Sequence, residues 1–207
     1  VTANAGGNAS SATKLQTTST GVTVTGIVAA TSFTGAFNSD AQNNTVLGTS
    51  AGDSFDGTNA ENNTLIGKNA GTAITTGDTN TAVGSESLDA NTTAARNTAI
   101  GYQSLSGNTT GERNTAAGTY SLLLNTTGSD NVAFGDAALY NNTTASYNTA
   151  VGRAAMSQNT TGENSTALGY NALTSNTTGA SNVAVGAHAL DANTEGTLNT
   201  AVGRECL

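Results

Sequence analysis

The chain has 207 residues, a formal net charge of −8 and only 10% charged residues, far below the roughly 25% of an ordinary globular protein. Binding to phosphate needs clustered Lys and Arg, and the six basic residues here are scattered along the chain, so a nucleic-acid partner is excluded. No apolar run reaches about 18 residues, so no membrane insertion is expected.

The first forty residues differ from the rest of the chain. Residues 20–37, TGVTVTGIVAATSFTGAF, alternate Thr with Val or Ile and predict β-structure. Residues 1–13 are typical of a linker or an extended strand. We therefore predict a β-rich linker or neck over residues 1–40. Since the chain starts at Val1 and stops inside a repeat, we also expect it to be a processed or excised piece of a longer polypeptide.

Residues 41–207 form about ten repeats. One glycine column makes this visible, with a first step of 19 residues and eight further steps of 17. Its members are Gly48, Gly67, Gly84, Gly101, Gly118, Gly135, Gly152, Gly169, Gly186 and Gly203. The consensus around them is N-T-A-[VIL]-G-x-x-[AS]-L-x-x-N-T-T-G-x-x, and residues 44–79 are degenerate repeats.

The length of the repeat predicts the fold class. A 17-residue unit is too short for a helical hairpin repeat, which needs roughly 33 residues. With only two apolar anchors it cannot fold alone, whereas two short strands and two turns fit it. We therefore predict an all-β protein, a parallel β-solenoid or β-roll of 17-residue rungs, each rung being one turn of the coil. Ten rungs would make a rod of roughly 45–50 Å.

Alternate residues of a strand face opposite sides, which predicts which columns fill the coil. We expect the larger apolar residues to point inward, and the Ala column beside them to face outward. Outward small apolar residues favour close contact with other chains, so we predict a homotrimer, either intertwined or side by side. The predicted core residues are Ile100, Leu105, Val151, Leu173, Val185 and Leu190, and the predicted subunit contacts are Ala99, Ala116, Ala150, Ala167 and Ala184.

Two asparagine columns are predicted to form hydrogen-bonded ladders along the stack, because side-chain amides stack well in cross-β arrangements. The named ladder residues are Asn97, Asn108, Asn114, Asn125, Asn148 and Asn159. In the N-T-T-G turn we expect Gly111, Gly128, Gly162, Gly179 and Gly196 to supply positive φ.

No catalytic constellation emerges, so we predict that the chain is not an enzyme and holds no cofactor or metal. His188 occupies a variable surface position, and Cys206 occupies the small-residue column. Residues 53–61, DSFDGTNAE, resemble a calcium loop but lack its spacing. N-T-T is also a glycosylation sequon, which we interpret as a requirement of the turn and ladder.

The positions just after each glycine vary while the frame stays constant. They include Tyr102, Tyr120, Asp136, Arg153, Tyr170 and His188. Exposed variable side chains on a stiff rod would suit contact with a receptor, and they would equally suit tolerated surface substitution. Both interpretations stay open.

The phrase NTAIGYQSLSGNTTGERNTAAG resembles the repeats of bacteriophage tail fibres and related virion proteins, and GVTVTGIVAATSFTGAF resembles a segment of the same fibres. More distantly, NTAVG is similar to a phrase in the head domains of trimeric autotransporter adhesins. The resemblance implies a structural segment of a virion tail fibre, extracellular, with other tail proteins and a host receptor or glycan as partners. In such fibres a self-cleaving chaperone domain often follows the repeats.

Two alternatives to a structural rod are considered. The first is an adhesin head that binds a cell surface or glycan directly. The second is an ice-binding solenoid, which a flat array of Thr would favour. The sequence indicates only one Thr per strand face, beside a large apolar residue.

Overall fold

The computed structural model describes residues 42–55 and 57–207. Over these residues the chain is an all-β parallel β-solenoid with ten strands and no helix, which confirms the predicted fold class. The β-rich segment predicted over residues 1–40, and the boundary beside it, lie outside the described residues.

Each rung contributes one strand of three residues. The strands are β1 (Thr45–Leu47), β2 (Thr64–Ile66), β3 (Thr81–Val83), β4 (Thr98–Ile100), β5 (Thr115–Ala117), β6 (Val132–Phe134), β7 (Thr149–Val151), β8 (Thr166–Leu168), β9 (Val183–Val185) and β10 (Thr200–Val202).

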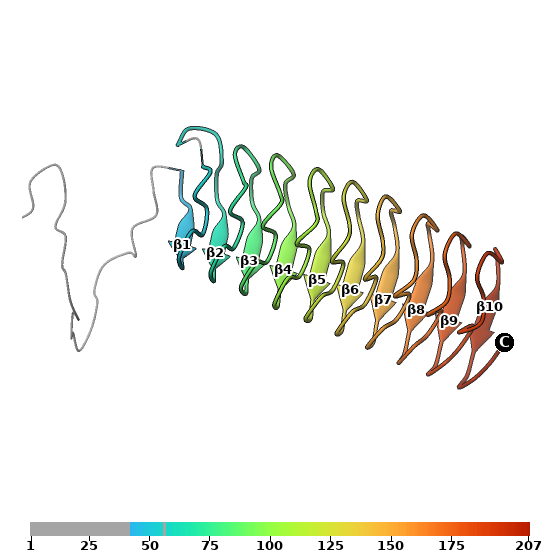
Figure 1. Ribbon diagram of the computed structural model, residues 1–207. Helices are drawn as coiled ribbons and strands as arrows, with labels where there is room; N and C mark the ends of the chain where they lie inside the picture. The colour runs from blue at the N-terminus through green and yellow to red at the C-terminus, as the bar shows by residue number, and fades with distance from the viewer. Residues whose placement is uncertain (1–41, 56) are drawn as a thin grey trace, which may run out of the picture. The chain divides into compact units, whose positions relative to one another are not determined.

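The ten strands form a single parallel sheet in chain order, so each strand pairs only with the strands of the rungs before and after it (Figure 1). The register is equally regular: Ala99 of β4 pairs with Ala82 of β3 and Ala116 of β5. Every repeat position therefore becomes a straight column of side chains along the stack.

The strands point their alanines into the coil, which reverses the prediction. Ala99 is fully buried, whereas the neighbouring Ile100 is 45% exposed. Val151 and Val185, also predicted to be core residues, are half-buried on the outer face of the sheet. The physical reason is that the asparagine before each Thr is buried too, and residues two apart in a strand share a face.

The interior of the rung is too small for a large side chain from both sides. The three other predicted core residues, Leu105, Leu173 and Leu190, do lie inside the coil, opposite the alanines. The sequence also predicts that the alanine before the leucine or methionine of this column faces outward, but Ala138, Ala155, Ala172 and Ala189 are buried too. Close packing of the interior explains why Ala faces Leu.

The second half of the rung is not a strand, although the sequence predicts two strands per rung. The leucine column has left-handed backbone angles, with φ of 52° at Leu105 and 49° at Leu122. This conformation costs roughly 1–2 kcal/mol for an L-residue. It is offset by burial of the leucine and by backbone bonds between rungs, such as Leu105 N to Ser121 O at 3.0 Å.

The glycine after each strand makes the corner of the coil. Its φ lies between 130° at Gly101 and 144° at Gly48, a region that is essentially restricted to glycine. A Cβ on Gly118 would also collide with the backbone carbonyl of Gly135 in the next rung. Both constraints explain why glycine fills this column without exception.

The turn glycines have another role than the one predicted. Gly111 and its equivalents do not have positive φ; that conformation falls two residues later, at Arg113 with φ of 56°. Glycine fits at 111 because a Cβ would approach the carbonyl of Gly128 and the side chain of Asn108. Ala94 and Ala145 occupy this position in two rungs, so the column accepts a methyl group.

These two glycine columns predict different costs for the same substitution. Gly118→Ala combines a forbidden φ with a backbone clash, so it should lower the melting temperature strongly. Gly111→Ala also brings a Cβ against a backbone carbonyl, but φ at this position is not positive and alanine already occurs in the column, so it should lower the melting temperature far less. Thermal unfolding followed by circular dichroism measures both, and equal losses would contradict the assigned roles.

Candidate assembly surface

The first asparagine column forms a ladder at the N-T-T-G turn, which we call the turn ladder. Its members are Asn91, Asn108, Asn125, Asn142, Asn159, Asn176 and Asn193. Asn125 Nδ2 donates to Asn108 Oδ1 at 2.8 Å and to the carbonyl of Gly128 at 2.9 Å. Its Oδ1 accepts from Asn142 Nδ2 at 2.8 Å, so each amide is bonded to the rungs on both sides.

The second column lies immediately before the strands, and we call it the strand ladder. It contains Asn44, Asn63, Asn80, Asn97, Asn114, Asn131, Asn148, Ser165, Asn182 and Asn199. Here each Oδ1 accepts the backbone N–H of the next member, as between Asn97 Oδ1 and Asn114 N at 2.9 Å. Ser165 substitutes for the amide by accepting from Asn182 N at 3.1 Å.

The two ladders meet at one backbone carbonyl in six of the rungs, at Ala94, Gly111, Gly128, Ala145, Gly162 and Gly196. Gly111 O accepts from Asn97 Nδ2 and from Asn108 Nδ2, both at 2.9 Å. All six ladder asparagines named from the sequence are fully buried. Since an unpaired buried amide is costly, the ladders hold the coil closed and hold its rungs in register.

This geometry also accounts for the N-T-T phrase. Thr109 Oγ1 donates to the carbonyl of Thr126 in the next rung at 2.9 Å, and the second threonine of each pair is exposed. Glycosylation would require the Nδ2 of Asn108, which is buried and bonded to Asn91 and Gly111. The sequon therefore reflects the turn and its ladder, as the sequence interpretation has it.

The outer face of the sheet presents two columns of side chains. The third residue of each strand forms what we call the apolar column: Leu47, Ile66, Val83, Ile100, Ala117, Phe134, Val151, Leu168, Val185 and Val202. The first residue is Thr in eight strands and Val in two, Val132 and Val183. Neither column contains a charged residue.

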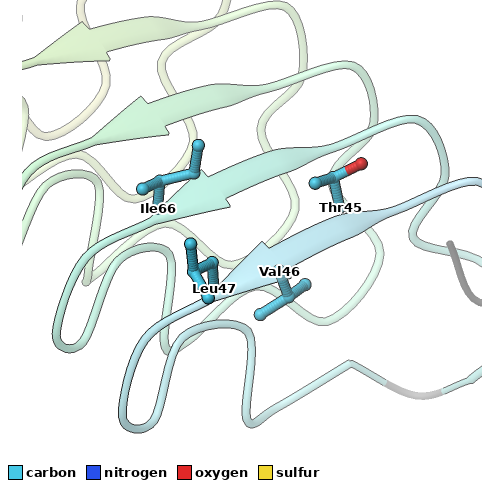
Figure 2. A pocket seen from close by; sticks show the side chains of 4 residues that line it. All are labelled: Thr45, Val46, Leu47 and Ile66. Atoms are coloured by element: carbon cyan, nitrogen blue, oxygen red, sulfur yellow. The ribbon is translucent and has the colours of Figure 1, made fainter. Parts of the chain in front are cut away.

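Exposure of large side chains is pronounced along the apolar column. Phe134 is 45% exposed, Leu168 is 46% exposed and Val202 is 67% exposed. At β1 and β2, Figure 2 shows Leu47 and Ile66 projecting from the same face while Val46 points away from it. Together with Thr45 these residues line a shallow hollow. A continuous apolar face of this kind is typical of an interaction site.

The alanines predicted as subunit contacts do not lie on this surface. Ala99, Ala116, Ala150, Ala167 and Ala184 are all fully buried inside their own coil, so they cannot touch another chain. The predicted role of these alanines as subunit contacts is therefore wrong. The strands expose their large apolar side chains mainly in the apolar column.

The variable positions after the glycine corner contact one another from rung to rung. The rings of Tyr102 and Tyr120 meet edge to face with centroids 5.4 Å apart, and those of Tyr120 and Tyr140 lie 6.3 Å apart. Gln103 Nε2 donates to Glu86 Oε2 at 2.7 Å. The negative charge of Glu86 raises the pKa of the Tyr102 phenol.

A second group of contacts continues through the later rungs. Arg153 pairs with Asp136 at 3.4 Å and lies over the ring of Tyr170 at 5.7 Å. The Tyr170 ring meets His188 at 5.1 Å, and His188 Nδ1 lies 3.0 Å from Asp191 Oδ2. We call the two groups together the variable ridge. Its side chains stack on their neighbours, which gives them a structural role.

One carboxyl group is held in an unfavourable environment. Asp89 is half-buried, and its Oδ1 is the one buried side-chain oxygen or nitrogen in the described residues without a hydrogen-bond partner. Burial raises the pKa of this carboxyl, and the hydrogen bond from Ser106 opposes the shift. The negative charge of Glu86 raises the pKa of Asp89 further.

Other chemistry finds no support in the described part of the chain. No group of three or more His, Cys, Asp or Glu side chains lies close enough together to hold a metal ion over residues 42–55 and 57–207. Cys206 is partly buried and unpaired with any cysteine there. Within the same ranges no helix has the length and apolarity needed to cross a bilayer.

Comparison with known proteins adds no information to the geometry described above. A scan against protein-family models gave no match, and neither curated proteins nor solved structures gave one.

The sequence carries the signal that places the apolar column on the outer face. The asparagines of the strand ladder are separated from the strand alanines by one residue, as in Asn97 and Ala99. Residues two apart in a strand share a face, so a strand ladder inside the coil requires the alanines inside and Ile100 outside. The prediction of Ile100 as a core residue did not take this requirement into account.

The turn ladder predicts a specific loss of stability. Asn125→Leu keeps the branched shape but removes three hydrogen bonds: Asn108 Oδ1 loses its donor, while Gly128 O and Asn142 Nδ2 each lose one of two partners. Unfolding should therefore become easier by about 1–3 kcal/mol. Thr127→Ala, on an exposed side chain of the same turn, should change little. Urea unfolding of both variants measures the difference, and a neutral Asn125→Leu would contradict a stabilising ladder.

Proposed function

We propose that the chain is a structural fibre segment, a rigid rod that assembles with two further copies of itself along the apolar column. The observation behind the proposal is that column, an uncharged and partly exposed row of Leu, Ile, Val and Phe on nine of the ten strands, with Ala117 on the tenth. The function is mechanical rather than catalytic. The rod holds a receptor-binding part of the fibre away from the particle and resists shear and proteolysis.

The apolar column extends along the whole stack. Ten strands about 4.8 Å apart and about 10 Å long give an outer face of about 430 Å². Three copies would remove about 1,300 Å² from water in total, or about 430 Å² for each pair, which is less than the roughly 1,200–2,000 Å² of a two-chain interface. The stability of the assembly therefore depends on all three contacts forming together. Charged side chains lie beside the face, as Arg153 and Asp136 do, and an apolar centre with a polar rim is typical of an interface.

The narrowness of the apolar column favours three copies around an axis. The column is one residue wide, with the threonine column on one side and the glycine corner on the other. Three such rows that converge on a common axis cover one another, and rotation about that axis closes the assembly. Subunits joined in this way must separate or unfold together, which slows unfolding.

The resemblance of NTAIGYQSLSGNTTGERNTAAG to phage tail-fibre repeats is the reason for placing this rod in a virion tail, outside cells. Other tail proteins would then be its partners at either end. The distant similarity to adhesin heads supports the same trimeric arrangement.

A second candidate function uses the same surface. Threonine faces outward on eight of ten strands, and a regular flat array of Thr and apolar side chains suits ice binding. Phe134 beside Ala117 makes the array uneven, which favours the assembly. A trimer would cover this face, whereas ice binding needs it free, so thermal hysteresis in a monomeric solution would decide for ice binding.

The adhesin-head alternative uses the variable ridge. Tyr102 and Tyr170 are exposed there, and such rings would suit contact with a glycan or a cell surface. If replacing both by Ala leaves adsorption to host cells unchanged, the rod is a spacer.

Charge placed on the apolar column should dissociate the assembly. Ile100→Asp combined with Leu168→Asp puts two carboxylates per chain into the proposed interface, where burial of charge is costly. Sedimentation equilibrium should report three chains for the natural sequence and one for this variant, with an unchanged circular dichroism spectrum.

The matched control is Thr110→Asp together with Thr161→Asp, which adds the same charge at exposed threonines of the N-T-T-G turn. This variant should remain trimeric. A natural sequence that sediments as a stable monomer would overturn the proposed assembly.

A further inference from the structure

The apolar column is nearly uniform in size except at two adjacent rungs. Eight of its ten positions hold Leu, Ile or Val, and the other two hold Ala117 and Phe134. These two residues are paired neighbours on β5 and β6. The smallest and the largest side chain of the column therefore lie next to each other near the middle of the stack.

The rung with the phenylalanine is unusual on its outer face in a second respect. Its first strand residue is Val132 where most rungs have Thr, so both outward side chains of β6 are apolar. Phe134 is 45% exposed, although an aromatic ring gains the most of any column residue from burial. The ring is thus a knob on the surface, and Ala117 leaves a gap beside it.

A uniform column alone does not define how two copies align. A shift by one rung would place Val, Ile or Leu opposite Val, Ile or Leu almost as well as the correct alignment, because these side chains have similar volumes. Sheets with weakly specified register are prone to slip. A single large-and-small pair removes this degeneracy among copies that run in the same direction, because only one alignment lets every Phe134 ring lie beside a neighbouring Ala117.

We propose that Phe134 of one copy packs into the space over Ala117 of the neighbouring copy, and that this pair sets the register of association. Rotation about an axis along the stack puts equal rungs of all copies at one level. Three Phe134 rings then meet at one level, and the level of Ala117 beside it accommodates their excess volume. This inference rests on the proposed self-assembly along the apolar column.

Disulfide cross-linking tests the alignment. In a Cys206→Ser background, single cysteines are placed on the apolar column as Val83→Cys, Ile100→Cys or Leu168→Cys, with one chain of each mixture carrying a size tag. The inference predicts that Val83→Cys and Leu168→Cys each cross-link to themselves under mild oxidation. Mixtures of Val83→Cys with Ile100→Cys, or with Leu168→Cys, should give no mixed product.

The role of the Phe134–Ala117 pair is tested in a variant whose apolar column has side chains of similar size at every position, which we call the levelled variant. Ala117→Val with Phe134→Val should keep the copies associated but allow slip, so that the self-cross-linked fraction falls by about half or more and the Val83–Ile100 product appears. Ile100→Val with Leu168→Val, in the chain with Val83→Cys, is the matched control and should keep the self-cross-link.

The outcomes separate the inference from the proposed function. A trimer in sedimentation equilibrium whose levelled variant stays strictly in register would overturn the role of Phe134 and Ala117 alone. A Val83–Leu168 product without self-cross-links would show antiparallel copies and overturn both the direction and the three-fold assembly. A monomer at every concentration would overturn the proposed function itself.

Discussion

The structure depends on a pair of hydrogen bonds in which one backbone carbonyl accepts from two asparagine side chains. We call this pair the node, and it recurs in most rungs. In the rung of β4, the carbonyl of Gly111 accepts from the side chains of Asn97 and Asn108. One amide precedes the strand and the other lies in the turn, so the shared acceptor ties the two sides of the coil together. The same amides bond to the rungs above and below. Because these groups are buried, a rung that lost them would leave several polar groups unpaired.

The node also decides what faces the solvent. With Asn97 inside, the two-residue period of the strand places Thr98 outside, Ala99 inside and Ile100 outside. The coil is then filled by alanines from one side and leucines from the other, and the larger β-branched residues are left on the outer face. A polar requirement inside the coil thus creates an apolar surface outside it, and that surface is what the proposed assembly uses.

Much of this architecture was predictable from the sequence, because a strict 17-residue period leaves few folds open. The repeat length, the glycine corners and the asparagine columns all indicated a stacked parallel coil. The facing of the strand was not predicted, since hydrophobicity favours Ile100 over Ala99 for a core. The left-handed leucines were missed for a similar reason: propensity does not anticipate Leu105 at φ of 52°. In both cases the bonds between rungs override the local preference.

The facing of the strand is the claim on which the rest of the account depends, and thiol labelling tests it most directly. Single cysteines are introduced as Ala99→Cys and Ile100→Cys in a chain with Cys206→Ser and Leu168→Asp, which should keep the chains apart. The account predicts that the thiol at position 100 reacts with a water-soluble reagent and that the thiol at position 99 is protected until the chain unfolds. A reactive thiol at 99 and a protected one at 100 would contradict it.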